Sequence, residues 1–195
     1  MKKISFLFFI CLTGLHFALS QSLPSNITIK PRNASGLNVY KGVTSATDLF
    51  YYISFDKKNA IEVIKDNGNH HSSIKLNGEA IDLAANEKSV FELLPKEKSI
   101  DVYNIVQGNF TRITGKGDAK IKKPVGMVMN PDGNLMVLEE SGVLLTFSPE
   151  GNVLKSTPLN GTVSPVSLQT DMAGNLYVLD DKLNAALKFL PDGKP

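Results

Sequence analysis

The sequence predicts an all-β protein assembled from repeated units, and two observations carry that prediction. The first is a repeat: PVGMVMNPDGNLMVLEE (residues 124–140) aligns with PVSLQTDMAGNLYVLDD (residues 165–181), so that Pro, Val, Gly-Asn-Leu, Val-Leu and an acidic pair recur 41 residues apart. The second is local composition. Gly-Asn and Asp-Gly pairs suit tight turns, and the runs of Val, Leu, Ile, Phe and Tyr between them suit half-buried antiparallel strands.

Units of this length with about four strands are typical of the blades of a β-propeller, in which neighbouring blades bury each other's faces. An earlier copy at residues 51–68 overlays residues 176–193, and residues 89–109 supply two further alternating apolar strands with a Gln-Gly turn. We therefore expect about four blades of four antiparallel strands, the last one incomplete. Their expected limits are about 37–77, 78–120, 121–162 and 163–195.

The segment GKGDAKIKKPVGMVMNPDGNLMVLEE, residues 115–140, resembles the NHL repeat. In that repeat a Gly-rich lead-in, a Pro before the innermost strand, a Pro-Asp-Gly-Asn turn and a strand with an acidic end recur. The resemblance covers about residues 112–195 and is weaker over 49–68. It implies a propeller that usually has six blades. The Asn-x-Arg element that usually follows the acidic residue is replaced by residues 141–144 and 184–187, so that Arg has no counterpart here.

Residues 1–20 have the organisation of a signal peptide. Lys2-Lys3 precede an apolar run at 4–17, and small residues stand at positions −3 and −1 before Gln21. The apolar run is too short to span a membrane. We therefore expect a secreted or periplasmic protein that begins at Gln21 and has no integral membrane segment after cleavage.

Residues 21–36 are rich in Ser, Asn and Pro, and we expect either a linker or a strand that closes the ring. The sequence stops at Pro195, after the third strand of its fourth unit, which leaves an unprotected sheet edge. Either residues 27–30 supply the missing strand in a four-bladed ring, or the sequence is part of a longer propeller. The second alternative is favoured because NHL-like rings are usually larger.

Composition argues against several function classes. Cys11, inside the expected signal peptide, is the only cysteine, so the mature chain has no disulfide, thiolate nucleophile or Cys-based zinc site. The absence of Trp argues against WD-type and quinoprotein propellers. The net charge is only +2 and the lysines are scattered, which argues against nucleic acid as a partner.

Acidic residues at the ends of the second strands are the candidate ligand-binding groups. In a propeller these ends lie on one face near the mouth of the central channel, where carboxylates from several blades could hold Ca²⁺ or another hard cation, as in gluconolactonase and regucalcin-like propellers. The alternative is that they solubilise loops and pair with lysines. A glutamine on an expected innermost strand is a further candidate. The set is Asp56, Glu139, Glu140, Gln169, Asp180 and Asp181.

Two functions are compatible with this pattern. The first is an exported binding or scaffold module for a protein, peptide or glycan. The second is a metal-dependent hydrolase or lyase of the gluconolactonase or streptogramin-lyase type, which would need His, Glu and Asn together at the channel mouth. The sequence places acids there but no His, which favours the binding module, although propellers host many unrelated activities. No catalytic residue is assigned.

Overall fold

The structure, a computed structural model, describes residues 39–44, 49–54, 60–65, 70–75, 77–86 and 88–195. These residues form four antiparallel sheets and contain no α-helix. Sheet 1 contains β1 (Val39–Thr44), β2 (Leu49–Ser54), β3 (Ala60–Lys65) and β4 (His70–Lys75), and sheet 2 contains β5 (Asp82–Ala85), β6 (Ser89–Leu94), β7 (Ser99–Asn104) and β8 (Asn109–Ile113). Sheet 3 contains β9 (Pro124–Met129), β10 (Leu135–Glu139), β11 (Val143–Phe147) and β12 (Val153–Pro158), and sheet 4 contains β13 (Pro165–Thr170), β14 (Leu176–Asp180) and β15 (Ala185–Phe189). A short 3-10 turn, Gly117–Ala119, precedes β9.

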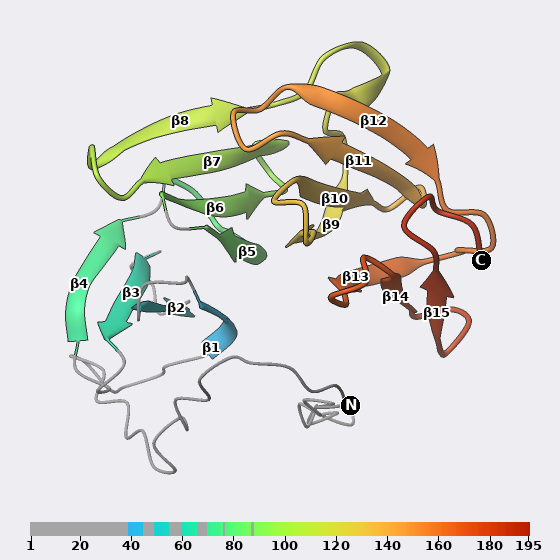
Figure 1. Ribbon diagram of the computed structural model, residues 1–195, viewed down its shortest axis with the longest axis horizontal. Coiled ribbons are helices and arrows are strands. Elements are labelled where there is room, and N and C mark those ends of the chain that lie inside the picture. Colours follow the sequence, from blue (N-terminus) through green and yellow to red (C-terminus); the bar gives the residue numbers. More distant parts are fainter. Residues whose placement is uncertain (1–38, 45–48, 55–59, 66–69, 76, 87) are drawn as a thin grey trace.

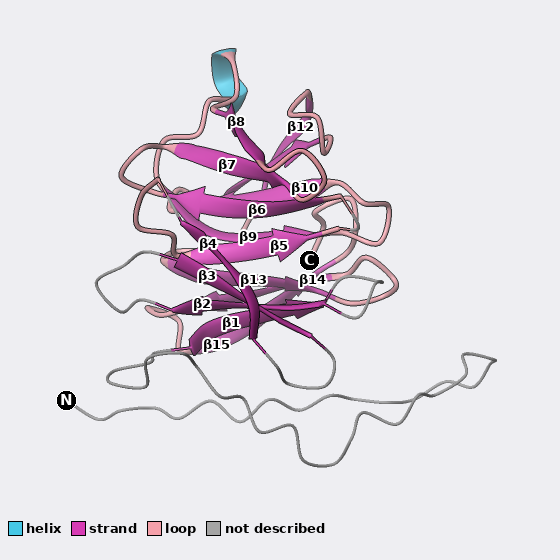
Figure 2. Ribbon diagram, turned by 90° about the vertical axis from the view of Figure 1, so that its left-hand side faces the viewer, coloured by secondary structure: helices cyan, strands magenta, loops and turns pink. Residues whose placement is uncertain are grey.

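Within each sheet, strands that follow one another in sequence are hydrogen-bonded neighbours. The sheets stand side by side around a common centre, with β5, β9 and β13 toward the inside and β8 and β12 at the periphery (Figure 1). Figure 2 shows the same sheets from the side. Neighbouring sheets meet through their innermost strands, β1 against β5, β5 against β9 and β9 against β13. This arrangement of antiparallel blades confirms the predicted all-β propeller fold.

The repeat seen in the sequence is also a repeat of backbone geometry. Gly133 and Gly174, 41 residues apart, close the β9–β10 and β13–β14 turns, and both have a φ of 80°. Their amides donate to the carbonyl oxygens of Asn130 and Asp171 at 2.9 and 3.0 Å. Because a side chain disfavours positive φ, Gly is required at these two points, which is why the turns could be located from the sequence.

The apolar core lies between adjacent sheets. Each sheet alternates its side chains between two faces, so every interior sheet contributes to two clusters. Three clusters result. Ile61, Leu83 and Leu94 pack between sheets 1 and 2; Phe91, Met127 and Phe147 between sheets 2 and 3; and Leu138, Leu168 and Phe189 between sheets 3 and 4. Burial of each such side chain stabilises the fold by roughly 1.5 to 3 kcal/mol.

Sheets 1 to 4 fall within the four units expected from the sequence, and sheet 4 contains three described strands. The expected signal peptide (residues 1–20) and the linker or closing strand (residues 21–36) lie outside the described residues. In the part of the chain that the structure describes, no helix is long and apolar enough to cross a membrane.

Candidate functional site

Glu139, the last residue of β10, is an acceptor for backbone amides. Its side chain is only 4% exposed. The two carboxylate oxygens accept from the amides of Lys122 and Lys123, at 3.1 and 2.6 Å, in the segment that leads into β9. The carboxylate thus ties the end of the second strand to the start of the first strand of the same sheet.

Asp180 has the same role in sheet 4, 41 residues later. It is 2% exposed and accepts from the amides of Val163 (2.6 Å), Ser164 (2.9 Å) and Leu183 (3.1 Å). Burial alone would raise the pKa of Asp180, but these backbone hydrogen bonds outweigh it and hold the pKa below its usual range. We call Glu139 and Asp180 the clasp carboxylates. Their predicted role as ligand groups remains a prediction.

The other predicted site residues are more exposed or lie elsewhere. Glu140 is exposed and pairs with the ammonium group of Lys123 at 2.9 Å. Asp181 and Gln169 are exposed, the first after β14 and the second on β13, and Asp56 lies outside the described residues. Among the described residues, no three His, Cys, Asp or Glu side chains are grouped so that they could hold a metal ion.

A groove of about 530 Å³ opens between sheets 2 and 3 at the opposite ends of the strands from the clasp carboxylates. Its walls are the β5–β6 turn, the β7–β8 turn, the adjoining parts of β6, β7 and β8, and the β11–β12 turn. We call it the asparagine groove. It is lined by Asn86, Lys88, Ser89, Val102, Asn104, Gln107, Asn109, Thr111, Pro149 and Glu150.

Two asparagines of the groove are fixed by their own turns. The Oδ1 atom of Asn86 accepts from the amides of Lys88 and Ser89 at 2.9 and 2.8 Å. The Oδ1 atom of Asn104 accepts from the amides of Val106 and Gln107 at 3.0 and 2.8 Å. Such turns hold the carboxamide plane in place. Among the described residues, neither Nδ2 group has a hydrogen-bond partner, and each is held in orientation by the bonds that its own Oδ1 accepts.

The two turns are also joined to each other. The amide of Ile105 donates to the carbonyl oxygen of Lys88 at 2.9 Å, and Asn104 is paired with Asn109 across β7 and β8. The donors of the groove are therefore carried by a hydrogen-bonded framework and not by independent loops. A framework of this kind lowers the ordering cost of binding.

The groove carries one cation and one anion on opposite walls, Lys88 from sheet 2 and Glu150 from sheet 3. The pKa of Glu150 is held below its usual range, chiefly by a hydrogen bond with Ser148 and to a smaller extent by the positive charge of Lys88. Glu150 is therefore ionised at neutral pH. The charges of these two residues offset each other across the groove.

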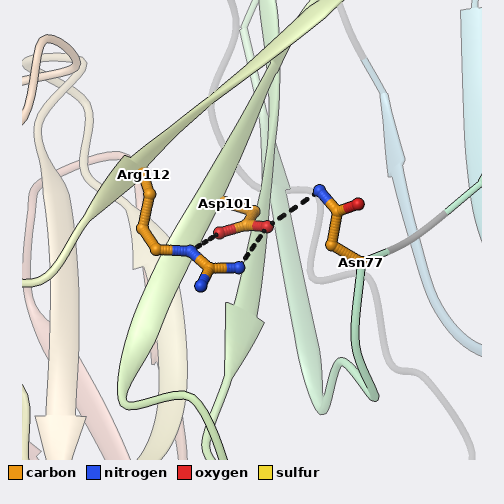
Figure 3. A network of polar contacts seen from close by, with 3 residues as sticks. All are labelled: Asn77, Asp101 and Arg112. Carbon is orange, nitrogen blue, oxygen red and sulfur yellow. Dashed lines mark hydrogen bonds and ion pairs between the residues drawn. The ribbon is translucent and has the colours of Figure 1, made fainter.

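A second polar cluster lies between sheets 1 and 2. Figure 3 shows its hydrogen-bonded part: Asp101 accepts from Nε and Nη2 of Arg112 at 2.5 and 2.9 Å and from the carboxamide of Asn77 at 3.2 Å. Glu92, opposite Asp101 in the sheet, is fully buried, and neither of its carboxyl oxygens has a partner within the described residues. Burial, aided by the charge of Asp101, raises the pKa of Glu92 to about 8. Glu92 is thus held in its neutral form at pH 7.

Sequence reasoning did not identify the asparagine groove. Asn86 and Asn104 follow apolar runs and are typical turn residues, so their sequence context indicates only turns. The opposing wall, Pro149 and Glu150, is contributed by the next repeat unit. The only signal available in the sequence is the clustering of Asn and Gln at the ends of the strands of one unit.

No protein-family model matches the chain, and no curated protein sequence is significantly similar to it. Solved structures with the same fold are numerous. The chain superimposes on one from the nidogen/laminin complex with a TM-score of 0.65, at 15% identity over 80% of this chain and 62% of the other. The virginiamycin B lyase of Staphylococcus aureus gives a TM-score of 0.58, at 12% identity over 83% and 58% of the two chains. The WD40 β-propeller domain of Doa1 gives 0.55, at 16% identity over 72% and 47%.

These similarities show a β-propeller fold and nothing finer, because the identities are low. The chain spans about half the length of the solved structures it matches. The matched proteins include a lyase and a component of a protein complex, so the fold is compatible with both functions expected from the sequence.

Proposed function

We propose that this protein is an exported binding module with NHL-like blades, and that its ligand, a protein segment, peptide or glycan, binds in the asparagine groove. The observation that carries the proposal is the pair of oriented Nδ2 donors on Asn86 and Asn104 in a groove of about 530 Å³. Its volume is within the usual range for ligand sites, roughly 300 to 1,000 Å³.

The placement of the predicted acids supports a binding module over metal-dependent chemistry. The oxygens of the clasp carboxylates accept hydrogen bonds from backbone amides, and Glu140 pairs with Lys123. The second candidate, a metal-dependent hydrolase or lyase, is favoured by the fold similarity to virginiamycin B lyase. A rise in melting temperature with millimolar CaCl₂ that EDTA reverses would support that candidate.

The binding proposal is tested with the exported full chain and two defined probe sets, neutral disaccharides and short peptides with blocked termini. Binding is followed by saturation-transfer NMR. We expect at least one set to bind, and we expect Asn104→Asp to weaken that binding by about tenfold or more. The aspartate retains the acceptor that forms the turn but removes the Nδ2 donor.

The matched control is Asn130→Asp in the β9–β10 turn. Asn130 lies outside the groove, and its Oδ1 accepts from the amide of Asn134 at 2.8 Å. Sheet 4 already has an aspartate at the equivalent position, Asp171, which accepts from the amide of Asn175 at 2.9 Å. This control should bind like the wild type. Failure of both probe sets, or binding that Asn104→Asp leaves intact, would contradict the proposal.

Export is tested separately by the intact mass of the protein recovered from the periplasm or medium of a bacterial host that expresses the full chain. Cleavage after Ser20 is expected. A product that retains residues 1–20 in the cytoplasm would contradict export without bearing on the groove.

A further inference from the structure

We infer that the asparagine groove binds a neutral saccharide, and this inference rests on the proposed binding function. The groove brings together carboxamide and hydroxyl side chains of sheet 2, and sheet 3 supplies its opposite wall. They are the carboxamides of Asn86, Asn104, Gln107 and Asn109 and the hydroxyls of Ser89 and Thr111. A sugar hydroxyl both donates and accepts hydrogen bonds, and carboxamides and hydroxyls offer both functions at short spacing.

The donors of the groove are oriented before any ligand arrives. Each Oδ1 atom of Asn86 and Asn104 is committed to two backbone amides, so each Nδ2 group is directed away from its turn. Two fixed N–H donors match oxygen acceptors held on a rigid ring. A rigid ligand and a rigid site together lose little conformational entropy on binding.

The charge distribution favours a neutral ligand. Lys88 and Glu150 stand on opposite walls and interact electrostatically, so the groove presents neither a net positive nor a net negative field. The ionised carboxylate of Glu150 is an acceptor for the hydroxyl groups of a sugar, and a charged acceptor forms stronger hydrogen bonds than a neutral one.

The lining is less suited to a peptide. A peptide bound through side chains needs an apolar or aromatic anchor pocket. The apolar members of the lining are Val102, which is 7% exposed, and Pro149, and no aromatic ring is among them. A peptide bound through its backbone needs an open strand edge. The carbonyl oxygens of Lys88 and Asn104, in the turns that form the groove, already accept from the amides of Ile105 and Gly108. The pyrrolidine ring of Pro149 instead offers a small apolar surface of the size of one sugar face.

The test uses the exported full chain and four neutral disaccharides: maltose, cellobiose, lactose and N,N′-diacetylchitobiose. Each is titrated by saturation-transfer NMR and isothermal calorimetry, beside blocked tripeptides and inorganic phosphate. We expect saturable binding of at least one disaccharide. The affinity should be indifferent to NaCl between about 0.05 and 0.5 M, because a neutral ligand forms no screened ion pair.

Two variants in the groove and one outside it make the result specific. Asn86→Asp and Asn104→Asp should each weaken disaccharide binding by about tenfold or more, since each loses one oriented hydrogen-bond donor. Asn130→Asp should bind with the wild-type affinity. All three should unfold within about 2 °C of the wild type, because aspartate suits these turns.

The outcomes separate this inference from the proposed function. If a tripeptide binds, no disaccharide binds and Asn104→Asp weakens the tripeptide binding, the saccharide inference is overturned. The groove then remains a binding site, as proposed. If inorganic phosphate binds with an affinity that falls steeply as the NaCl concentration rises, the inference that the ligand is neutral is overturned. Absence of binding by every probe overturns both the saccharide inference and the binding proposal.

Discussion

At the scale of single residues, Glu92 links the stability of the fold to pH. The carboxyl group is buried between sheets 1 and 2 beside Asp101, and its pKa rises from 4.5 to about 8 on folding. Between these two pH values the folded protein holds a proton that the unfolded chain releases. The free energy of unfolding therefore falls as pH rises through this window. The total loss is on the order of 3 to 5 kcal/mol.

Replacement of Glu92 by Gln removes the titrating group and retains the shape of the side chain. We expect Glu92→Gln to unfold at about the same urea concentration as the wild type at pH 5 and at a clearly higher one at pH 9. The measurement is urea unfolding at pH 5, 7 and 9, followed by circular dichroism. If the variant loses stability with pH as steeply as the wild type, another group carries the effect.

Asp101, the neighbouring buried acid, has the hydrogen-bond donors that Glu92 lacks. It receives two hydrogen bonds from Arg112 and one from Asn77, whereas the Glu92 carboxyl receives none from the described residues. A charge in a protein interior is tolerated when donors surround it. The two acids are buried to a similar extent and differ in their hydrogen-bond partners.

At the scale of elements, the clasp carboxylates join the second strand of a blade to the segment before its first strand. Loss of the carboxylate leaves two backbone amides unsatisfied at Glu139 and three at Asp180. We expect Glu139→Ala and Asp180→Ala each to lower the free energy of unfolding by about 2 to 3 kcal/mol. Urea unfolding measures the loss, and hydrogen exchange should quicken at the amides of Lys123 and Ser164.

The adjacent acids provide matched controls. Glu140 and Asp181 follow the clasp carboxylates directly and are exposed. Their replacement by Ala should change stability by less than about 0.5 kcal/mol. If Glu140→Ala and Asp181→Ala lowered the free energy of unfolding as much as Glu139→Ala and Asp180→Ala, the hydrogen bonds to the backbone would not be the cause of the loss.

The elements themselves were largely predictable from the sequence, for a physical reason. Gly133 and Gly174 occupy positions that demand positive φ, so the turns, and the strands between them, follow from residue type. The acidic pair at the end of the second strand was also visible as a repeat. Its bonds to the backbone were not, because the sequence shows which residues recur and does not show which amide a carboxylate reaches.

At the scale of the whole molecule, the two polar features lie on opposite faces of the arc of sheets. The clasp carboxylates stand at one set of strand ends, and the asparagine groove opens at the other. The groove requires two blades at a fixed angle, since Lys88 and Glu150 come from sheets 2 and 3. No single repeat contains it, which is why a search for motifs within one unit misses it.

Gly126, on β9, lies where the innermost strands of sheets 3 and 4 meet. It is buried, and a Cβ atom placed there would lie 3.1 Å from the backbone nitrogen of Leu168 on β13. The equivalent residue of sheet 4, 41 positions later, is Ser167, which is only half-buried. We expect Gly126→Ala to force sheets 3 and 4 apart and to cost about 1 to 3 kcal/mol of unfolding free energy. Ser167→Ala should change it by less than about 0.5 kcal/mol. Urea unfolding of both variants measures the difference in unfolding free energy. If the two variants are equally stable, β9 and β13 can move apart to accept the methyl group without loss of stability.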